Sequence, residues 1–132
     1  MDLDDLLPRP RLNWNMSADE IRAEEARIQS VFAAELDAIA RDPEPSHEGA
    51  FGRFSSALAE ASLHSSQCTL PALVSQSKDA REASSHSKKR IKAMFSSAFR
   101  RDIYDALVRA SSSPEGGDAS QAAFQSEVLE MF

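Results

Sequence analysis

The fold is decided by residues 17–43, which read SADEIRAEEARIQSVFAAELDAIARDP. Ser17 stands three residues before Glu20, the spacing of a capping box, in which each side chain accepts a hydrogen bond from the other residue's backbone amide. Five apolar residues follow at spacings of seven, four, four and three, on one stripe of a helix: Ile21, Ile28, Phe32, Leu36 and Ile39. Because Asp42-Pro43 cannot continue a helix, the stretch predicts an amphipathic helix from Ser17 to near Arg41.

The chain after Pro43 predicts a second helix that fades through Ser65-Ser66 before Pro71. Ser46 can cap this helix, although Gly49 and Gly52 weaken its first turns by about 1 kcal/mol each relative to Ala. Its apolar stripe consists of four residues at helical spacing: Phe51, Phe54, Leu58 and Ala61.

Three more apolar stripes predict the remaining helices. A third helix is expected to open at Ser77 and a fourth to follow it, and the residues leave open whether the two are continuous. Their stripes consist of Ile91, Met94 and Phe95, then Ile103, Leu107 and Ala110. Asp118 and Gln121 have capping-box spacing ahead of a last stripe of Phe124, Val128, Leu129 and Phe132.

The expected fold class is therefore all-α, with about five helices and no sheet. Only Leu70 to Val74 has strand character, and Pro71 inside that run argues against a strand. The predicted core contains eleven residues from all but the last of these helices: Ile21, Ile28, Phe32, Leu36, Phe51, Phe54, Leu58, Ile91, Phe95, Ile103 and Leu107.

The same pattern divides the chain into two parts. Residues 1–16 are expected to form an irregular, acidic, Pro-containing arm, and residues 17–132 a helical subdomain. The last apolar stripe reaches Phe132 with no Gly, Asn or basic last turn to close the helix. We therefore expect the subdomain to be truncated at its C-terminus.

Composition excludes two classes of partner. The 132 residues carry 15 Lys and Arg against 21 Asp and Glu, a net charge of −6, which repels phosphate backbones and argues against nucleic-acid binding. No apolar run approaches the ~20 residues that a membrane-spanning helix needs. The first seven residues, MDLDDLL, contain three acids and no base, unlike a targeting leader. We expect a cytoplasmic chain, and its single cysteine, Cys68, fits a reducing compartment.

The histidines do not predict a zinc site. A thermolysin-type site needs two His one helical turn apart with a Glu as general base, in the pattern H-E-x-x-H. The chain has only His47, His64 and His86; His47-Glu48 begins the pattern, but Phe51 occupies the position of the second His. His47 is therefore interpreted as a residue at the start of the second helix.

Other chemistry is also not predicted. Cys68 follows His64 by four residues, within reach on a helix, but a small cysteine near a helix end more often packs than reacts. Four glycines form neither a P-loop nor a Gly-x-Gly-x-x-Gly pattern. We predict no catalytic, cofactor-binding or metal-ligating residue in this chain.

Two segments could bind a partner. Residues 88–92, KKRIK, with Arg100-Arg101 could dock an acidic partner, although a solvated face paired with neighbouring acids is the favoured interpretation. Leu3 to Leu7 fits a short Leu-x-x-Leu-Leu docking motif, which a composition this common matches by chance.

Three stretches of the sequence resemble one protein family. They are residues 12–21, LNWNMSADEI; residues 74–84, VSQSKDAREAS; and residues 101–104, RDIY. The central block, S-x-S-K-D-x-R-x-A-S, is the specific one. Together they are similar to the N-terminal helical region of the thimet oligopeptidase, neurolysin and saccharolysin family of zinc metallopeptidases. The similarity covers roughly residues 12 to 110, and the last helix more weakly.

The resemblance implies a helical subdomain that forms part of one wall of a deep substrate channel. The full-length relatives are cytosolic or mitochondrial enzymes that use zinc to cut short peptides. Their H-E-x-x-H and distant Glu ligand lie far downstream, so no zinc or catalytic residue is carried over to this chain. Alone, it is expected to be inactive and to self-associate through exposed apolar faces. The alternative is a small helical protein–protein interaction module.

Overall fold

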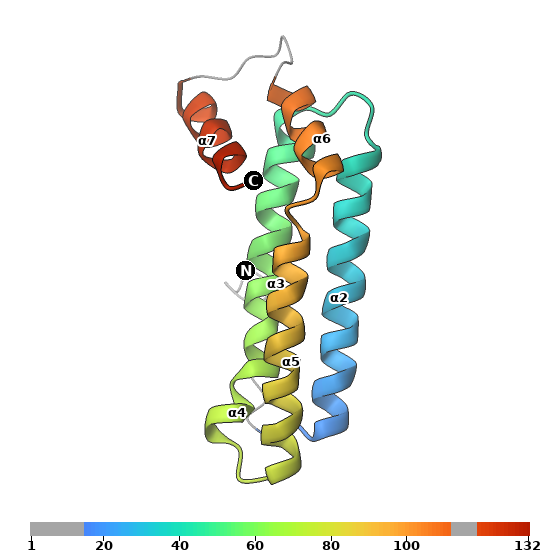
Figure 1. Ribbon diagram of the computed structural model, residues 1–132, viewed down its shortest axis with the longest axis vertical. Helices are drawn as coiled ribbons and strands as arrows, with labels where there is room; N and C mark the ends of the chain where they lie inside the picture. The colour runs from blue at the N-terminus through green and yellow to red at the C-terminus, as the bar shows by residue number, and fades with distance from the viewer. Residues whose placement is uncertain (1–14, 112–118) are drawn as a thin grey trace, which may run out of the picture.

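The computed structural model describes residues 15–111 and 119–132, and these residues form helices and no strand. Three long helices lie side by side in alternating directions (Figure 1). They are α2 (Ala18–Arg41), α3 (Arg53–Thr69) and α5 (Lys78–Ser97). The short α4 (Pro71–Val74) lies at one end of this bundle, and α6 (Arg101–Ser111) and α7 (Ala119–Glu130) lie at the other. The predicted all-α fold is confirmed.

Helix α2 begins and ends where its sequence predicts. The Glu20 amide donates to Ser17 Oγ at 3.1 Å and the Ser17 amide donates to Glu20 Oε1 at 3.2 Å, so the capping box is formed. The helix ends at Arg41, because Asp42 takes an extended conformation ahead of Pro43.

Helix α3 is preceded by a wider turn that the sequence did not predict. Residues Glu48–Gly52 form a π-helical turn, η1, which runs directly into α3. Ser46 caps this turn as expected, because its Oγ accepts a hydrogen bond from the Gly49 amide at 3.0 Å. The helix continues through Ser65 and Ser66 to Thr69, and the Ser65 hydroxyl donates to the Ala61 carbonyl within the helix.

The segment with strand character is a helical turn. Residues Pro71–Val74 form α4, with proline in the first position. An amide at this position would have no hydrogen-bond partner within the helix, so the missing N–H of proline costs nothing there. The preceding Leu70 is also helical, so the chain passes from α3 into α4 without an extended residue.

The question of continuity between the third and fourth predicted helices is settled. Helix α5 begins after Ser77, whose Oγ accepts from the Ala80 amide at 3.3 Å, and ends at Ser97. Three residues, 98–100, separate it from α6. Asp118 lies outside the described residues, as do residues 1–14 with the Leu3–Leu7 segment.

The predicted core packs as one cluster. Nine of the eleven predicted residues are buried, and Leu58 and Phe95 are partly buried against them. The cluster also contains alanines from three helices, which let the helices approach closely: Ala57, Ala61, Ala80, Ala83, Ala106 and Ala110. Helix α7 joins through Val128, which is buried, with three residues partly buried beside it: Phe124, Leu129 and Phe132.

Candidate functional site

The junction between α3, α4 and α5 is built around one buried hydroxyl. The Ser84 Oγ donates to the Cys68 carbonyl and accepts from the Ala72 amide at 3.0 Å. Residues 68 and 72 are four apart, the spacing of a direct α-helical hydrogen bond. The Ser84 hydroxyl therefore stands in the place of that backbone bond and joins α5 to the chain around Pro71.

Three further residues of the S-x-S-K-D-x-R-x-A-S block shape the same junction. The Arg81 Nη1 donates to the Ser75 carbonyl at 2.9 Å, across the turn between α4 and α5. The Ser75 Oγ accepts from the Ser77 amide at 3.2 Å, and Ser77 is the N-cap of α5. We name this set, Ser75, Ser77, Arg81 and Ser84, the α4–α5 junction. All of its described bonds run within the chain.

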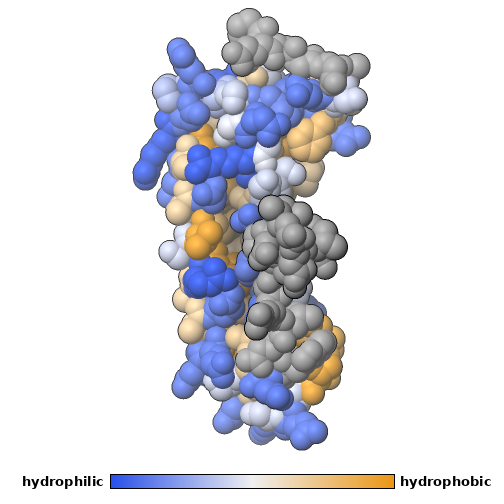
Figure 2. Space-filling view, turned by 180° about the vertical axis from the view of Figure 1, so that it is seen from behind, coloured by the Kyte–Doolittle hydropathy of each residue, from blue (hydrophilic) through white to orange (hydrophobic). Residues whose placement is uncertain are grey.

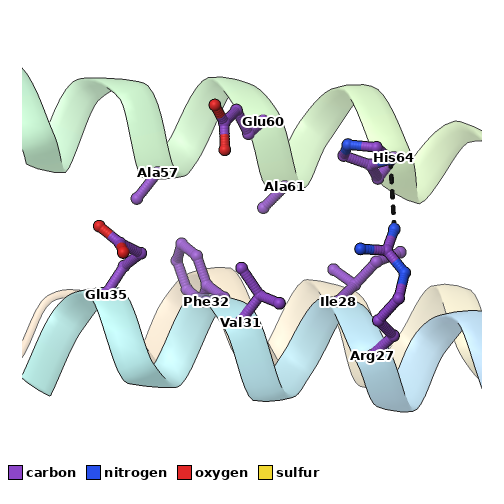
Figure 3. Close-up of a pocket in the computed structure, with 9 residues that line it drawn as sticks. All are labelled: Arg27, Ile28, Val31, Phe32, Glu35, Ala57, Glu60, Ala61 and His64. Carbon is purple, nitrogen blue, oxygen red and sulfur yellow. Dashed lines mark hydrogen bonds between the residues drawn. The ribbon is translucent and has the colours of Figure 1, made fainter. Parts of the chain in front are cut away.

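A groove runs along the outside of α2 and α3 (Figure 3). Its space, including its open mouth, amounts to about 430 Å³. The floor is apolar and buried, and consists of Ile28, Phe32, Ala57 and Ala61. Val31 also lines the groove, yet 49% of its surface is exposed. Figure 2 shows apolar residues gathered on the α2 side of the bundle and at the end that carries α4. We name the groove between α2 and α3 the α2–α3 groove.

The two ends of the α2–α3 groove differ in charge. Arg27 and His64 line one end, where the guanidinium Nη2 lies 3.3 Å from His64 Nδ1. Glu35 lies at the other end, and Glu60 lines the same groove as a further exposed carboxylate. The groove therefore has a basic end and an acidic end with Val31 between them.

Both charged ends also contact groups outside the groove. Arg27 donates to the Glu24 carboxylate, and this hydrogen bond lowers the pKa of Glu24 and raises the pKa of Arg27. Arg53 donates to Glu35 at 2.7 and 3.2 Å and so lowers the pKa of Glu35. All four groups are therefore charged at neutral pH, as they would also be without these shifts.

The α2–α3 groove is not predicted by the sequence pattern. The one feature of the sequence that points to the groove is Val31, a β-branched apolar residue outside the buried stripe of α2. An apolar side chain on the polar side of an amphipathic helix marks a surface that can take a partner.

The arginines of the basic stretch that begins at Lys88 are paired with acids, whereas its lysines are solvent-exposed, so the favoured interpretation holds for the arginines. Arg90 Nε donates to Glu25 Oε1 at 2.8 Å, which joins α5 to the buried carboxylate of α2. Arg101 pairs with Asp105 at 3.2 Å on α6. The lysines of the segment, Lys88, Lys89 and Lys92, are exposed.

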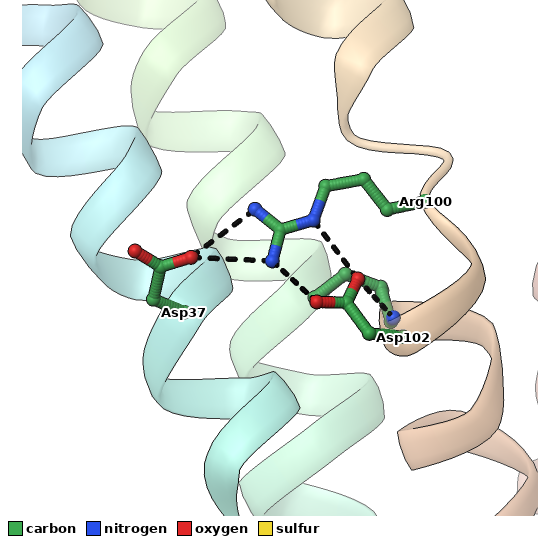
Figure 4. A network of polar contacts seen from close by, with 4 residues as sticks. Asp37, Arg100 and Asp102 are labelled. Atoms are coloured by element: carbon green, nitrogen blue, oxygen red, sulfur yellow. Dashed lines mark hydrogen bonds and ion pairs between the residues drawn. The ribbon is translucent and has the colours of Figure 1, made fainter.

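Arg100 links three elements at the break between α5 and α6 (Figure 4). Its guanidinium donates to Asp37 Oδ1 of α2 at 3.2 Å and to both Asp102 oxygens at 2.9 and 2.7 Å. This arrangement raises the pKa of Arg100 and lowers the pKa of Asp102. The network fixes the chain direction between α5 and α6.

The three histidines lie in separate surroundings. His47 stands at the start of the π-helical turn as expected, with its ring stacked on Phe51 at 5.5 Å between centroids and its Nδ1 2.9 Å from Gln125 Nε2 of α7. His64 lies in the groove, and His86 is exposed on α5. Within residues 15–111 and 119–132, no group of three or more His, Cys, Asp or Glu could hold a metal ion.

Cys68 is packed, as predicted, and not poised for reaction. It is fully buried, and its Sγ donates a long hydrogen bond of 3.7 Å to the Ile21 carbonyl. Burial raises the pKa of the Cys68 thiol to about 11, so the nucleophilic thiolate is scarce at neutral pH. His64, one helical turn earlier, contacts Arg27 instead.

Comparisons of the sequence with protein-family models and with curated proteins find no match. In the described part of the chain, no helix combines the length and the apolar character that crossing a bilayer would require.

Proposed function

We propose that this chain is the N-terminal helical region of a zinc oligopeptidase similar to neurolysin, and that it is a scaffold rather than a catalytic unit. Its role in the whole enzyme is to form part of the wall of a channel for short peptides. The proposal rests on the resemblance of residues 12–21, 74–84 and 101–104 to that family.

One observation carries the scaffold role. The most specific block of the resemblance, residues 75–84, forms the α4–α5 junction. Ser77 caps a helix, Arg81 holds a turn and Ser84 bridges a break in the backbone hydrogen bonds. These contacts set the directions of α3, α4 and α5 relative to one another. A wall of a substrate channel needs helices whose relative directions are fixed in this way.

The described residues do not fit the zinc ion that the longer relatives use. His47 contacts Gln125 and His64 contacts Arg27, and in the part of the chain that the structure describes neither belongs to a group of three His, Cys, Asp or Glu that could hold a metal ion. Activation of water at neutral pH needs a metal-bound water or a positioned base. The sequence lacks the H-E-x-x-H pattern that supplies both in these peptidases.

An assay of peptide cleavage tests the scaffold role. The purified chain is mixed with a quenched fluorogenic peptide and Zn²⁺, with and without a chelator. We expect no turnover above the rate of the peptide and Zn²⁺ alone. Chelator-sensitive cleavage by the purified chain would show that it contains its own catalytic site.

The second candidate function is a helical interaction module. The α2–α3 groove favours it, because Val31 is half exposed over an apolar floor. Sedimentation and circular dichroism of the isolated chain test this candidate. A stable helical monomer or a defined small oligomer supports a module, whereas indefinite aggregation argues that the chain needs the remainder of a larger fold.

A further inference from the structure

Two charged residues of α2, Arg27 and Glu35, are placed symmetrically about Val31. Arg27 precedes Val31 by four residues and Glu35 follows it by four. Residues four apart lie on one face of a helix, so the three side chains form a single row along the α2–α3 groove (Figure 3). The row reads basic, apolar, acidic from its N-terminal to its C-terminal end.

The charges of this row are complementary to those of a second copy of the same row that runs in the opposite direction. If two copies of α2 pack antiparallel about a two-fold axis at Val31, each Arg27 lies opposite the Glu35 of the other copy. The two Val31 side chains then meet at the axis. Two-fold interfaces require such a self-complementary patch, in which residue i contacts residue j and j contacts i.

The side chains have the exposure and the hydrogen-bonding capacity that this contact needs. Arg27 is 50% exposed and Glu35 is 37% exposed. Within the described part of the chain, the hydrogen bonds of Arg27 use its Nε and Nη2, and a guanidinium also has the two donors of Nη1. A carboxylate such as that of Glu35 accepts about four hydrogen bonds, and Arg53 supplies two.

The surface beside the row permits close approach of a second helix. Ser30 and Ala34 are both exposed, and they lie one position before and three positions after Val31. Small side chains at these positions let another helix come near enough to bury Val31. Glu60 and His64, four residues apart on α3, line the same groove.

We propose that the α2–α3 groove is the interface of an antiparallel two-fold dimer of this chain, centred on Val31. The occupant of each groove is the α2 helix of the second copy, held in register by two reciprocal Arg27–Glu35 contacts. This proposal does not depend on the peptidase assignment, since it uses only the row of α2 and the groove.

Mixing of charge-reversal variants tests the register directly. The Arg27→Glu and Glu35→Arg variants each place like charges opposite one another twice, so we expect each alone to raise the dimer Kd by about tenfold or more. In a one-to-one mixture, one chain presents two acids and the other two bases. The mixture is therefore expected to regain the dimer, at about twice the 14.5 kDa of one chain.

Sedimentation equilibrium of the wild type, the two variants and the mixture gives the result. The matched control is the exposed pair Lys78 and Glu82 on α5, reversed singly as Lys78→Glu and Glu82→Lys, which should leave the dimer unchanged. Val31→Asp should abolish it, whereas Leu73→Asp, at a residue 81% exposed on α4, should not. Circular dichroism confirms that each variant is folded.

Three outcomes would overturn the proposal. A wild-type chain that is monomeric throughout the concentration series leaves the groove to a different protein or to another part of a longer chain. Single variants that dimerise as the wild type does would place the contact elsewhere. A mixture that stays monomeric while the wild type dimerises would exclude the antiparallel register.

Discussion

Ser84 of α5 donates a hydrogen bond to the carbonyl of Cys68 on α3, and the same hydroxyl accepts from the amide of Ala72. One buried side chain thus completes the backbone hydrogen bonding around Pro71. Replacement of Ser84 by Ala would leave the buried Cys68 carbonyl and the partly buried Ala72 amide without this partner. Such a loss costs about 1–3 kcal/mol, which we expect as a reduced free energy of unfolding in urea titrations.

Ser87 provides the matched control for Ser84. It lies three residues further along α5 and is equally buried, but its Oγ has no hydrogen-bond partner by distance and angle within the described chain, although it faces the Cys68 thiol. Ser87→Ala removes an unpaired buried hydroxyl, so we expect unchanged or higher stability. Equal destabilisation by both variants would contradict the bridging role of Ser84.

Cys68 should resist thiol reagents in the folded chain. Its side chain is fully buried and the pKa of its thiol is raised to about 11 by burial. We expect labelling with a disulfide reagent at pH 8 to be slow in buffer and to become fast in denaturing urea. Rapid stoichiometric labelling without denaturant would show that α3 is not packed against α2 as described.

Asp102 should make part of the stability depend on acid pH. The Arg100 guanidinium lowers the pKa of Asp102 below its ordinary value of about 3.9. The stabilisation by ionised Asp102 is therefore complete above about pH 5 and is lost as the pH falls through the lower pKa of the folded state. Asp102 is 51% exposed, so solvent screening limits the effect to about 1 kcal/mol or less.

The variant Asp102→Asn tests this dependence. We expect it to be less stable than the wild type in urea unfolding at pH 7, and the difference between them to shrink at pH 2. A difference of the same size at both pH values would mean that the Arg100 contact does not act through the charge of Asp102.

Gly52→Ala should stabilise the start of α3. Gly52 has ordinary helical angles, and a Cβ there would press only on the end of the flexible Glu48 side chain. Alanine is favoured over glycine in a helix by about 1 kcal/mol, so we expect a rise in the thermal midpoint. At Gly49 a Cβ would lie 3.1 Å from Ser46 Oγ, the cap of this turn, so Gly49→Ala should gain less.

The sequence predicts the helices well because their signals are local. The capping box at Ser17, the stripe from Ile21 to Ile39 and the stop at Pro43 depend only on spacing along one helix. The π-helical turn before Arg53 was not predicted, since it has no composition that distinguishes it from an α-helical turn.

The α2–α3 groove and the Ser84 bridge could not be predicted in the same way. Arg27 of α2 and Glu60 of α3 line the same groove, and both lie there only because α3 packs on α2. From the sequence alone, Ser84 is only a residue with low helix propensity. Its bridging hydrogen bonds form because Cys68 and Ala72 lie close to it in the folded chain. Contacts between distant segments carry no periodic signal.

Sequencing of the full-length transcript that encodes this chain tests the central claim most directly. If the chain is the N-terminal scaffold of a zinc oligopeptidase, the reading frame continues beyond Phe132 and reaches a His-Glu-x-x-His pattern far downstream. A stop codon directly after Phe132 would contradict that account.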